Sequence, residues 1–106
     1  MNAPAVVARF IDAVNRGDSS AVLAFFDPHT GVVVDAGRRF VGHKEIGPWY
    51  EREFVGAGGR LIPNDVQFDG QIVTVVGRWE STFHTGPTRF VFVLDGSRIA
   101  ELTMGQ

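Results

Sequence analysis

The sequence contains no cysteine, which excludes disulfide bonds, thiol chemistry and thiolate metal sites. It has a single lysine, Lys44, and nine arginines scattered along 106 residues, with a formal net charge of -2. A nucleic-acid surface needs concentrated positive charge, so we expect no nucleic-acid partner. No apolar run approaches the roughly 18 residues that a membrane span needs, so we expect no membrane association either.

Metal-ligand and phosphate-binding patterns are also missing. His29, His43 and His84 are isolated, with no second ligand at helical or strand spacing. The glycines of residues 56–59 precede a predicted strand, whereas a phosphate loop precedes a helix. We therefore expect no metal and no cofactor. The N-terminus lacks a basic start followed by an apolar block, which predicts no secretion signal and a cytoplasmic protein.

The residues that are present place helices first and strands afterwards, within one domain of residues 1–106. Apolar residues recur at helical spacing from Ala5 to Asn15, Asp18 is a natural cap for a second helix, and a third is predicted from about His43 to Phe54. Strands are then predicted at residues 60–68, 71–84, 89–94 and 98–104, with turns at 69–70, 85–87 and 95–96. This order predicts an α+β fold with a mainly antiparallel sheet.

The predicted sheet is apolar on both faces, most clearly in residues 89–94, so each face needs a cover. The helices supply one cover, and a second copy of the chain is the expected other, which predicts a homodimer.

The central stretch, residues 31–54, carries the main candidate for chemistry. The β-branched run Val32 to Val34 predicts a buried strand, and Asp35 follows it directly. The helix after it carries aromatic residues at three- to four-residue spacing. A carboxylate at a strand end opposite an aromatic helix is typical of an apolar pocket with one polar group, but an Asp at a strand end is also typical of a solvated turn.

Several segments together resemble the nuclear transport factor 2-like superfamily, which includes ketosteroid isomerases, limonene epoxide hydrolases and SnoaL-like polyketide cyclases. They are ARFIDAVNRGDSSAVLAFF, VVVDAG, RRFVG, HKEIGPWY, GRWESTF and FVFVLDGSRIAEL. The resemblance implies a cone-shaped barrel of helices packed on a curved sheet, with an apolar cavity and dimerisation through the outer sheet face. We expect a small hydrophobic organic ligand in a cavity lined by Phe10, Val14, Phe26, Arg38, Trp49, Phe54, Trp79, Phe90 and Phe92.

The resemblance also suggests a catalytic role for Asp35. In ketosteroid isomerases the matching Asp is the general base that moves a proton next to a ketone, and an apolar pocket makes an Asp a better base. The isomerase hydroxyl matches Phe10, which cannot donate to an enolate, and the second oxyanion group falls near Phe90. A limonene-type hydrolase needs an Asp-Arg-Asp set.

For that hydrolase set, Asp35, Arg38 or Arg78, and Glu80 are the candidates. Glu80 and Trp79 point to opposite faces of their strand, so only one of them can line the cavity. The leading hypothesis is therefore a cofactor-free isomerase, cyclase or hydrolase with Asp35 as its base. The alternatives are a non-catalytic module that binds a hydrophobic ligand or only dimerises, and a protein-binding adaptor with an exposed apolar patch.

Overall fold

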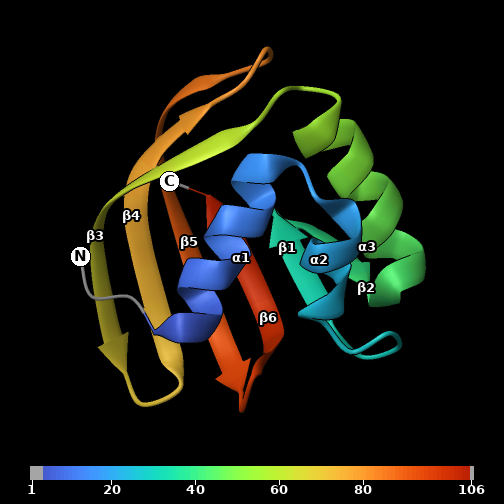
Figure 1. Ribbon diagram of the computed structural model, residues 1–106, viewed down its shortest axis with the longest axis vertical. Helices are drawn as coiled ribbons and strands as arrows, with labels where there is room; N and C mark the ends of the chain where they lie inside the picture. Colours follow the sequence, from blue (N-terminus) through green and yellow to red (C-terminus); the bar gives the residue numbers. More distant parts are fainter. Residues whose placement is uncertain (1–3, 106) are drawn as a thin grey trace.

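Helical segments cover one face of a six-stranded sheet in the computed structural model, which describes residues 4–105 (Figure 1). The helical segments are α1 (Ala5–Arg16), α2 (Ser19–Ala24), α3 (Gly42–Tyr50) and its π-helical continuation η1 (Glu51–Val55). The strands are β1 (Val32–Asp35), β2 (Arg38–Val41), β3 (Arg60–Asp69), β4 (Ile72–Glu80), β5 (Thr85–Asp95) and β6 (Arg98–Gly105).

The join between the first two helices follows the capping signals of the sequence. Gly17 ends α1 in the left-handed conformation, at φ 68°, which a glycine adopts without steric cost. Asp18 begins α2, where its side chain accepts a hydrogen bond of 3.1 Å from the amide of Ala21. The predicted helix-Gly-Asp-helix unit is therefore confirmed, and it turns the apolar face of α1 toward the sheet.

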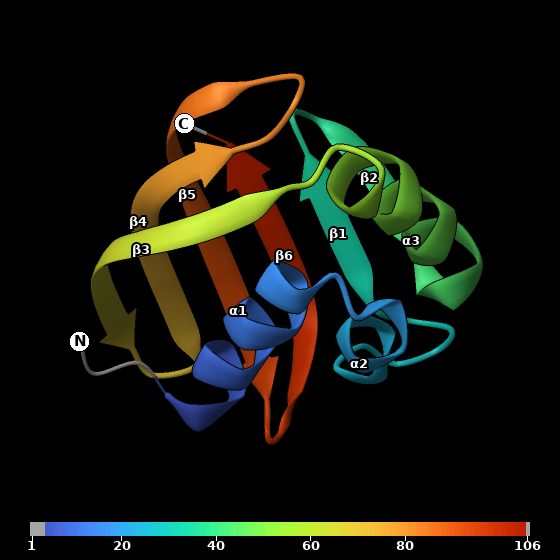
Figure 2. The same cartoon turned by 45° about the horizontal axis from the view of Figure 1, so that its top comes forward.

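The sheet has the strand order β2-β1-β6-β5-β4-β3, and all neighbouring strands are antiparallel except β1 and β6. The α+β class is confirmed. The sheet curves around α1 as the resemblance implies (Figure 2), but β2 and β3 remain its two edges, so the barrel is open. Asn15 ties α1 to edge strand β3, because its side-chain amide exchanges hydrogen bonds of 2.8 and 2.9 Å with the backbone of Leu61.

The hairpin between β4 and β5 differs from the prediction. The chain turns at residues 81–84, where the amide of Ser81 donates to the carbonyl of His84 at 3.0 Å, and Gly86 and Pro87 belong to β5. Pro87 pairs with Arg78 on β4, whereas pairing with β6 starts only at Arg89. Its missing amide therefore costs no bond to β6, which explains why a Gly-Pro pair can sit inside this strand.

Burial in β5 differs between its two faces. Phe90 and Phe92 are fully buried on the helix side, while Val91 and Val93 on the outer face are only half-buried. The helices thus cover one face of the sheet. Among residues 4–105 there is no helix of the length and apolarity that crossing a membrane requires.

Candidate functional site

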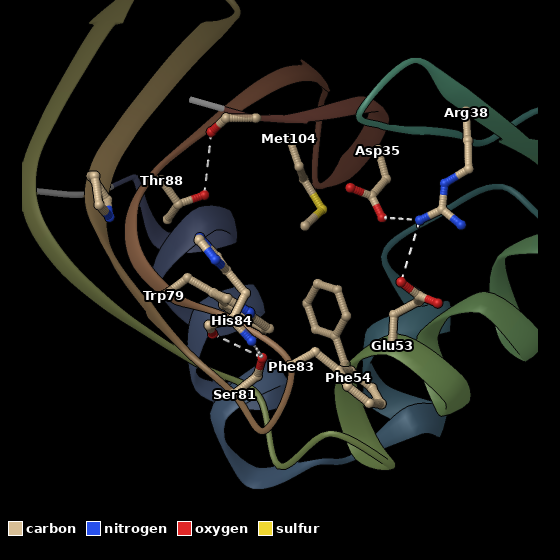
Figure 3. A pocket seen from close by; sticks show the side chains of 12 residues that line it. Asp35, Arg38, Glu53, Phe54, Trp79, Ser81, Phe83, His84, Thr88 and Met104 are labelled. Carbon is tan, nitrogen blue, oxygen red and sulfur yellow. Dashed lines mark hydrogen bonds and ion pairs between the residues drawn. The ribbon is translucent and has the colours of Figure 1, made fainter.

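A cavity of about 280 Å³ opens between the ends of β1 and β6, the segment η1 and the β4–β5 hairpin (Figure 3). Twelve residues line it: Asp35, Arg38, Glu53, Phe54, Trp79, Ser81, Phe83, His84, Pro87, Thr88, Met104 and Gly105. Its volume lies at the lower end of the range of roughly 300–1,000 Å³ that is usual for ligand pockets. A bicyclic molecule suits such a space better than a tetracyclic one.

Asp35 is fixed at this cavity through one of its two oxygens. Its Oδ2 accepts a hydrogen bond of 2.8 Å from Nη2 of Arg38 and one of 3.0 Å from Nε1 of Trp49. Its Oδ1 receives no hydrogen bond from any residue of the described chain, and Figure 3 shows this oxygen on the cavity side. The side chain is 20% exposed. The carboxylate is thus held in one orientation with a free acceptor toward the cavity.

Local sequence explains how Arg38 reaches Asp35. Ala36 and Gly37 form a two-residue hairpin loop with φ of 51° and 84°, a combination that matches the twist of the flanking strands. The loop makes Asp35 and Arg38 direct partners in the β1–β2 register. The Arg38 guanidinium also lies over the ring of Phe40, 5.7 Å from its centroid.

A second carboxylate shares Arg38. Nη2 of Arg38 is 3.3 Å from Oε1 of Glu53, and Nε of Arg52 donates to the other Glu53 oxygen at 3.1 Å. Burial opposes ionisation of Glu53, but the bonds from Arg52 and Arg38 outweigh it and lower the pKa of Glu53. The bond to Glu53 and the charges of Glu53 and Asp35 in turn raise the pKa of Arg38. Glu53 and Arg38 are therefore both ionised at neutral pH.

The structure places four of the residues proposed from the sequence at the cavity: Asp35, Arg38, Phe54 and Trp79. Trp49 is buried behind Asp35 and reaches it through the indole N–H. The remaining five are buried in the core beneath the cavity: Phe10, Val14, Phe26, Phe90 and Phe92. The rings continue from Trp79 through Phe90 and Phe92 to Phe10, with centroids 5.5 to 6.4 Å apart, so aromatic side chains fill the interior.

Trp79, and not Glu80, lines the cavity from β4. Glu80 instead accepts a 3.1 Å bond from Arg78 outside the cavity. The second carboxylate beside Arg38 is therefore Glu53, not Glu80, which was the sequence-based candidate.

Several lining residues were not identified from the sequence, chiefly Glu53, Phe83, Thr88 and Met104. His84 is exposed, and it also lines the cavity. The alternation of residues 79, 81 and 83 on one face was the signal for Phe83, whereas Glu53 has none, because only the docking of α3 and η1 brings it to Arg38. Within residues 4–105 no group of three or more His, Asp or Glu side chains is arranged to hold a metal ion.

Comparison with known proteins identifies one family and several solved structures with the same fold. Residues 7–106 match the SnoaL-like domain. A candidate polyketide cyclase from Sinorhizobium meliloti is 26% identical, with a TM-score of 0.89 over 97% of this chain and 95% of that one. No protein with a curated description matches the chain significantly.

Two more distant structures share the fold. A protein with a ketosteroid isomerase-like fold from Catenulispora acidiphila, solved with trimethylamine, is 17% identical, with a TM-score of 0.86 over 99% of this chain and 87% of that one. An epoxide hydrolase/cyclase-like enzyme of pyran ring formation in salinomycin is 20% identical, with a TM-score of 0.83 over 93% of this chain and 85% of that one.

Proposed function

Since the chain belongs to the SnoaL-like domain family, we propose that it binds a small, largely apolar organic molecule and acts on it without a cofactor, with Asp35 as general base. The observation that carries this proposal is the free Oδ1 of Asp35 on the cavity side of a carboxylate whose other oxygen is held by two donors. A base must be positioned before it is useful, and two fixed bonds position this one.

The proposed step is removal of a proton from a carbon next to a carbonyl group. Oδ1 of Asp35 takes the proton, and the electron pair of the C–H bond moves into the carbonyl to form an enolate. In an isomerisation, Asp35 then returns the proton to another carbon. In a cyclisation, the enolate carbon attacks a second carbonyl of the same molecule, and the alkoxide formed there takes the proton back from Asp35. Phe54 and Trp79 supply the apolar wall against which the carbon skeleton packs.

A hydrolase is the second candidate, because Asp35 and Glu53 both contact Arg38 and both line the cavity. Oδ1 of Asp35 would then activate a water molecule that opens an epoxide ring, while the Arg38–Glu53 pair keeps Asp35 in place. The salinomycin enzyme with the same fold supports keeping this alternative. A non-catalytic binding module is the third, and Phe10, which has no hydroxyl group, favours it.

The test is exchange of the acidic protons of β-tetralone in deuterium oxide, followed by proton NMR. Asp35→Asn is nearly isosteric, and its amide oxygen can still accept from Arg38 and Trp49. We expect the wild type to accelerate exchange and Asp35→Asn to lose about 10²-fold or more, the usual contribution of a general base. Asp12→Asn, an exposed substitution on α1, is the matched control and should keep the full rate.

The outcomes distinguish the three candidate functions. Catalysed exchange that survives Asp35→Asn contradicts the proposed role of Asp35. Binding of β-tetralone without exchange supports the non-catalytic module. Opening of styrene oxide that is lost in both Asp35→Asn and Glu53→Gln, without ketone exchange, supports the hydrolase.

We also propose that two copies pair through the outer sheet face. Ile72 and Val76 are exposed there, beside the half-buried Val91 and Val93 of β5. The register places Asp69 and Glu101 at the Ile72 end of this face, and Arg78 and Arg89 toward the other end. A two-fold axis perpendicular to the strands would set Asp69 and Glu101 of one copy against Arg89 and the Arg78–Glu80 pair of the other.

A further inference from the structure

Phe83 is the most exposed large apolar side chain of residues 4–105, at 75%, and it lines the same cavity as Asp35. It sits in the turn between β4 and β5, and it lines the cavity together with Trp79 of β4. An aromatic ring left in water forgoes the stabilisation that burial would give it. A ring that is both exposed and adjacent to a cavity gains that stabilisation when the cavity is occupied.

The backbone on both sides of Phe83 is held in place. The amide and the hydroxyl of Thr82 both donate to the carbonyl of Ala57, each at 2.8 Å. The amide and the hydroxyl of Ser81 both donate to the carbonyl of His84 at 3.0 Å. The turn is therefore closed on itself and tied to the segment before β3. A ligand therefore has only the side-chain torsions of Phe83 to order, because the backbone that carries the ring is already held.

The other aromatic residues of the cavity form a second surface for a ligand. Phe54 and Trp79 are packed on each other with centroids 4.8 Å apart, and both line the cavity with Phe83 (Figure 3). The Asp35 carboxylate adjoins this aromatic space. A molecule held here would meet aromatic rings over its carbon skeleton and a hydrogen-bond acceptor at its polar edge.

We propose that Phe83 is a specificity-determining residue, a fixed aromatic cover that selects flat bicyclic ligands over puckered ones of the same size. This inference rests on the proposed function of the cavity and adds the shape of its ligand. A flat ring offers its whole face to Phe83, whereas a saturated skeleton holds the two surfaces apart.

The surroundings of Phe83 favour a small ligand over a protein partner. Its chain neighbours Thr82 and His84 are polar, and the other strongly exposed apolar side chains, Phe68 and Ile72, flank the β3–β4 turn at the opposite end of β4. Phe83 is therefore not part of a continuous apolar patch of the kind that marks a protein interface.

The experiment compares β-naphthol with its saturated analogue β-decalol, by isothermal titration calorimetry. The proteins are the wild type, Phe83→Ala, Phe83→Leu and the control Phe68→Ala, which removes a ring of 58% exposure far from the cavity. We expect the wild type and Phe68→Ala to bind β-naphthol about two- to tenfold more tightly than β-decalol, the range of one aromatic contact. Both Phe83 variants should show a smaller preference than the wild type, and only the contribution of Phe54 and Trp79 should remain. Phe83→Leu keeps apolar bulk, so its loss assigns the effect to the ring.

The inference is overturned if Phe83→Ala keeps the wild-type preference, if Phe83→Leu keeps it, or if neither bicyclic compound binds the wild type. It is also overturned if Phe83→Ala changes only the sedimentation coefficient, because the ring then contacts another protein copy. Failure of the proposed function is distinguishable: β-tetralone exchange would be absent in the wild type, while the preference for β-naphthol persists.

Discussion

Gly59→Ala should destabilise the protein by driving Trp79 toward the cavity. A methyl group on Gly59 would lie 2.4 Å from both Cζ2 and Cη2 of Trp79, whereas carbon atoms pack at about 3.5–4.0 Å. The ring must therefore move by about 1 Å or more. Phe54 and Phe90 pack against it, with centroids 4.8 and 6.4 Å away, so the cavity is the open direction.

Overpacking of this kind typically costs about 1–3 kcal/mol, and we expect a loss in this range in the free energy of unfolding. The assay is urea unfolding followed by far-ultraviolet circular dichroism, which does not depend on Trp79 fluorescence. The same substitution in a Trp79→Leu background should cost little, because the ring edge is gone. The double-mutant cycle then gives a coupling of about 1–3 kcal/mol.

Gly47→Ala serves as a control substitution that makes no contact with Trp79. Its methyl group would lie 3.6 Å from Cδ1 of Leu23, an ordinary contact, inside α3. Helix propensity favours Ala by about 0.5–1 kcal/mol, but the Pro48 ring crowds a Cβ on the helical residue before it, so we expect a smaller cost than that of Gly59→Ala. An equal cost of Gly59→Ala with and without Trp79, or no cost at all, would refute the packing argument.

Three further predictions concern other parts of the molecule. Burial raises the pKa of Tyr50, the single tyrosine, to about 12, so titration at 295 nm should show late ionisation. The contribution of the neutral hydroxyl to the free energy of unfolding should be full below the unfolded pKa of about 10 and should be lost as pH rises toward 12. Tyr50→Phe should remove this loss of stability, and ionisation of Tyr50 at pH 10 in the folded protein would contradict the prediction. Asn15→Leu leaves the Leu61 amide and carbonyl unpaired and should cost about 2–4 kcal/mol in urea unfolding; a loss below about 0.5 would contradict this. Val76→Glu places a charge on the outer sheet face and should turn dimers into monomers in sedimentation velocity, and an unchanged dimer would place the interface elsewhere.

Local signals made much of the fold predictable. Gly17 and Asp18 mark the α1–α2 join, and the hairpin turns at Gly70 and Gly96 need the positive φ of 61° and 60° that glycine supplies. These features depend on a few neighbouring residues, so a single sequence reveals them. The position predicted for the β4–β5 turn was wrong because Gly86-Pro87 is also a local turn signal. These two residues can lie in β5 because β6 pairs with β5 only from Arg89 onward.

The site was less predictable because its contacts join distant residues. Asp35 was identified from its place at a strand end, but Trp49 and Glu53 reach its surroundings only through the docking of α3 and η1. Phe90 and Trp79 are both aromatic residues on the inward-facing positions of their strands, so the alternation of the sequence does not distinguish them. Which of them faces the cavity depends on where the strands end, and periodicity alone does not give that.

The most direct test of the account is a crystal structure of the protein with β-naphthol bound. The account predicts the naphthol hydroxyl within about 2.5–3.0 Å of Oδ1 of Asp35, with the fused rings between Phe83 and Trp79. Two results would contradict the claim that the Asp35 carboxylate contacts the ligand and acts as the base. One is a naphthol bound elsewhere, and the other is a naphthol in the cavity whose hydroxyl makes no hydrogen bond to Asp35.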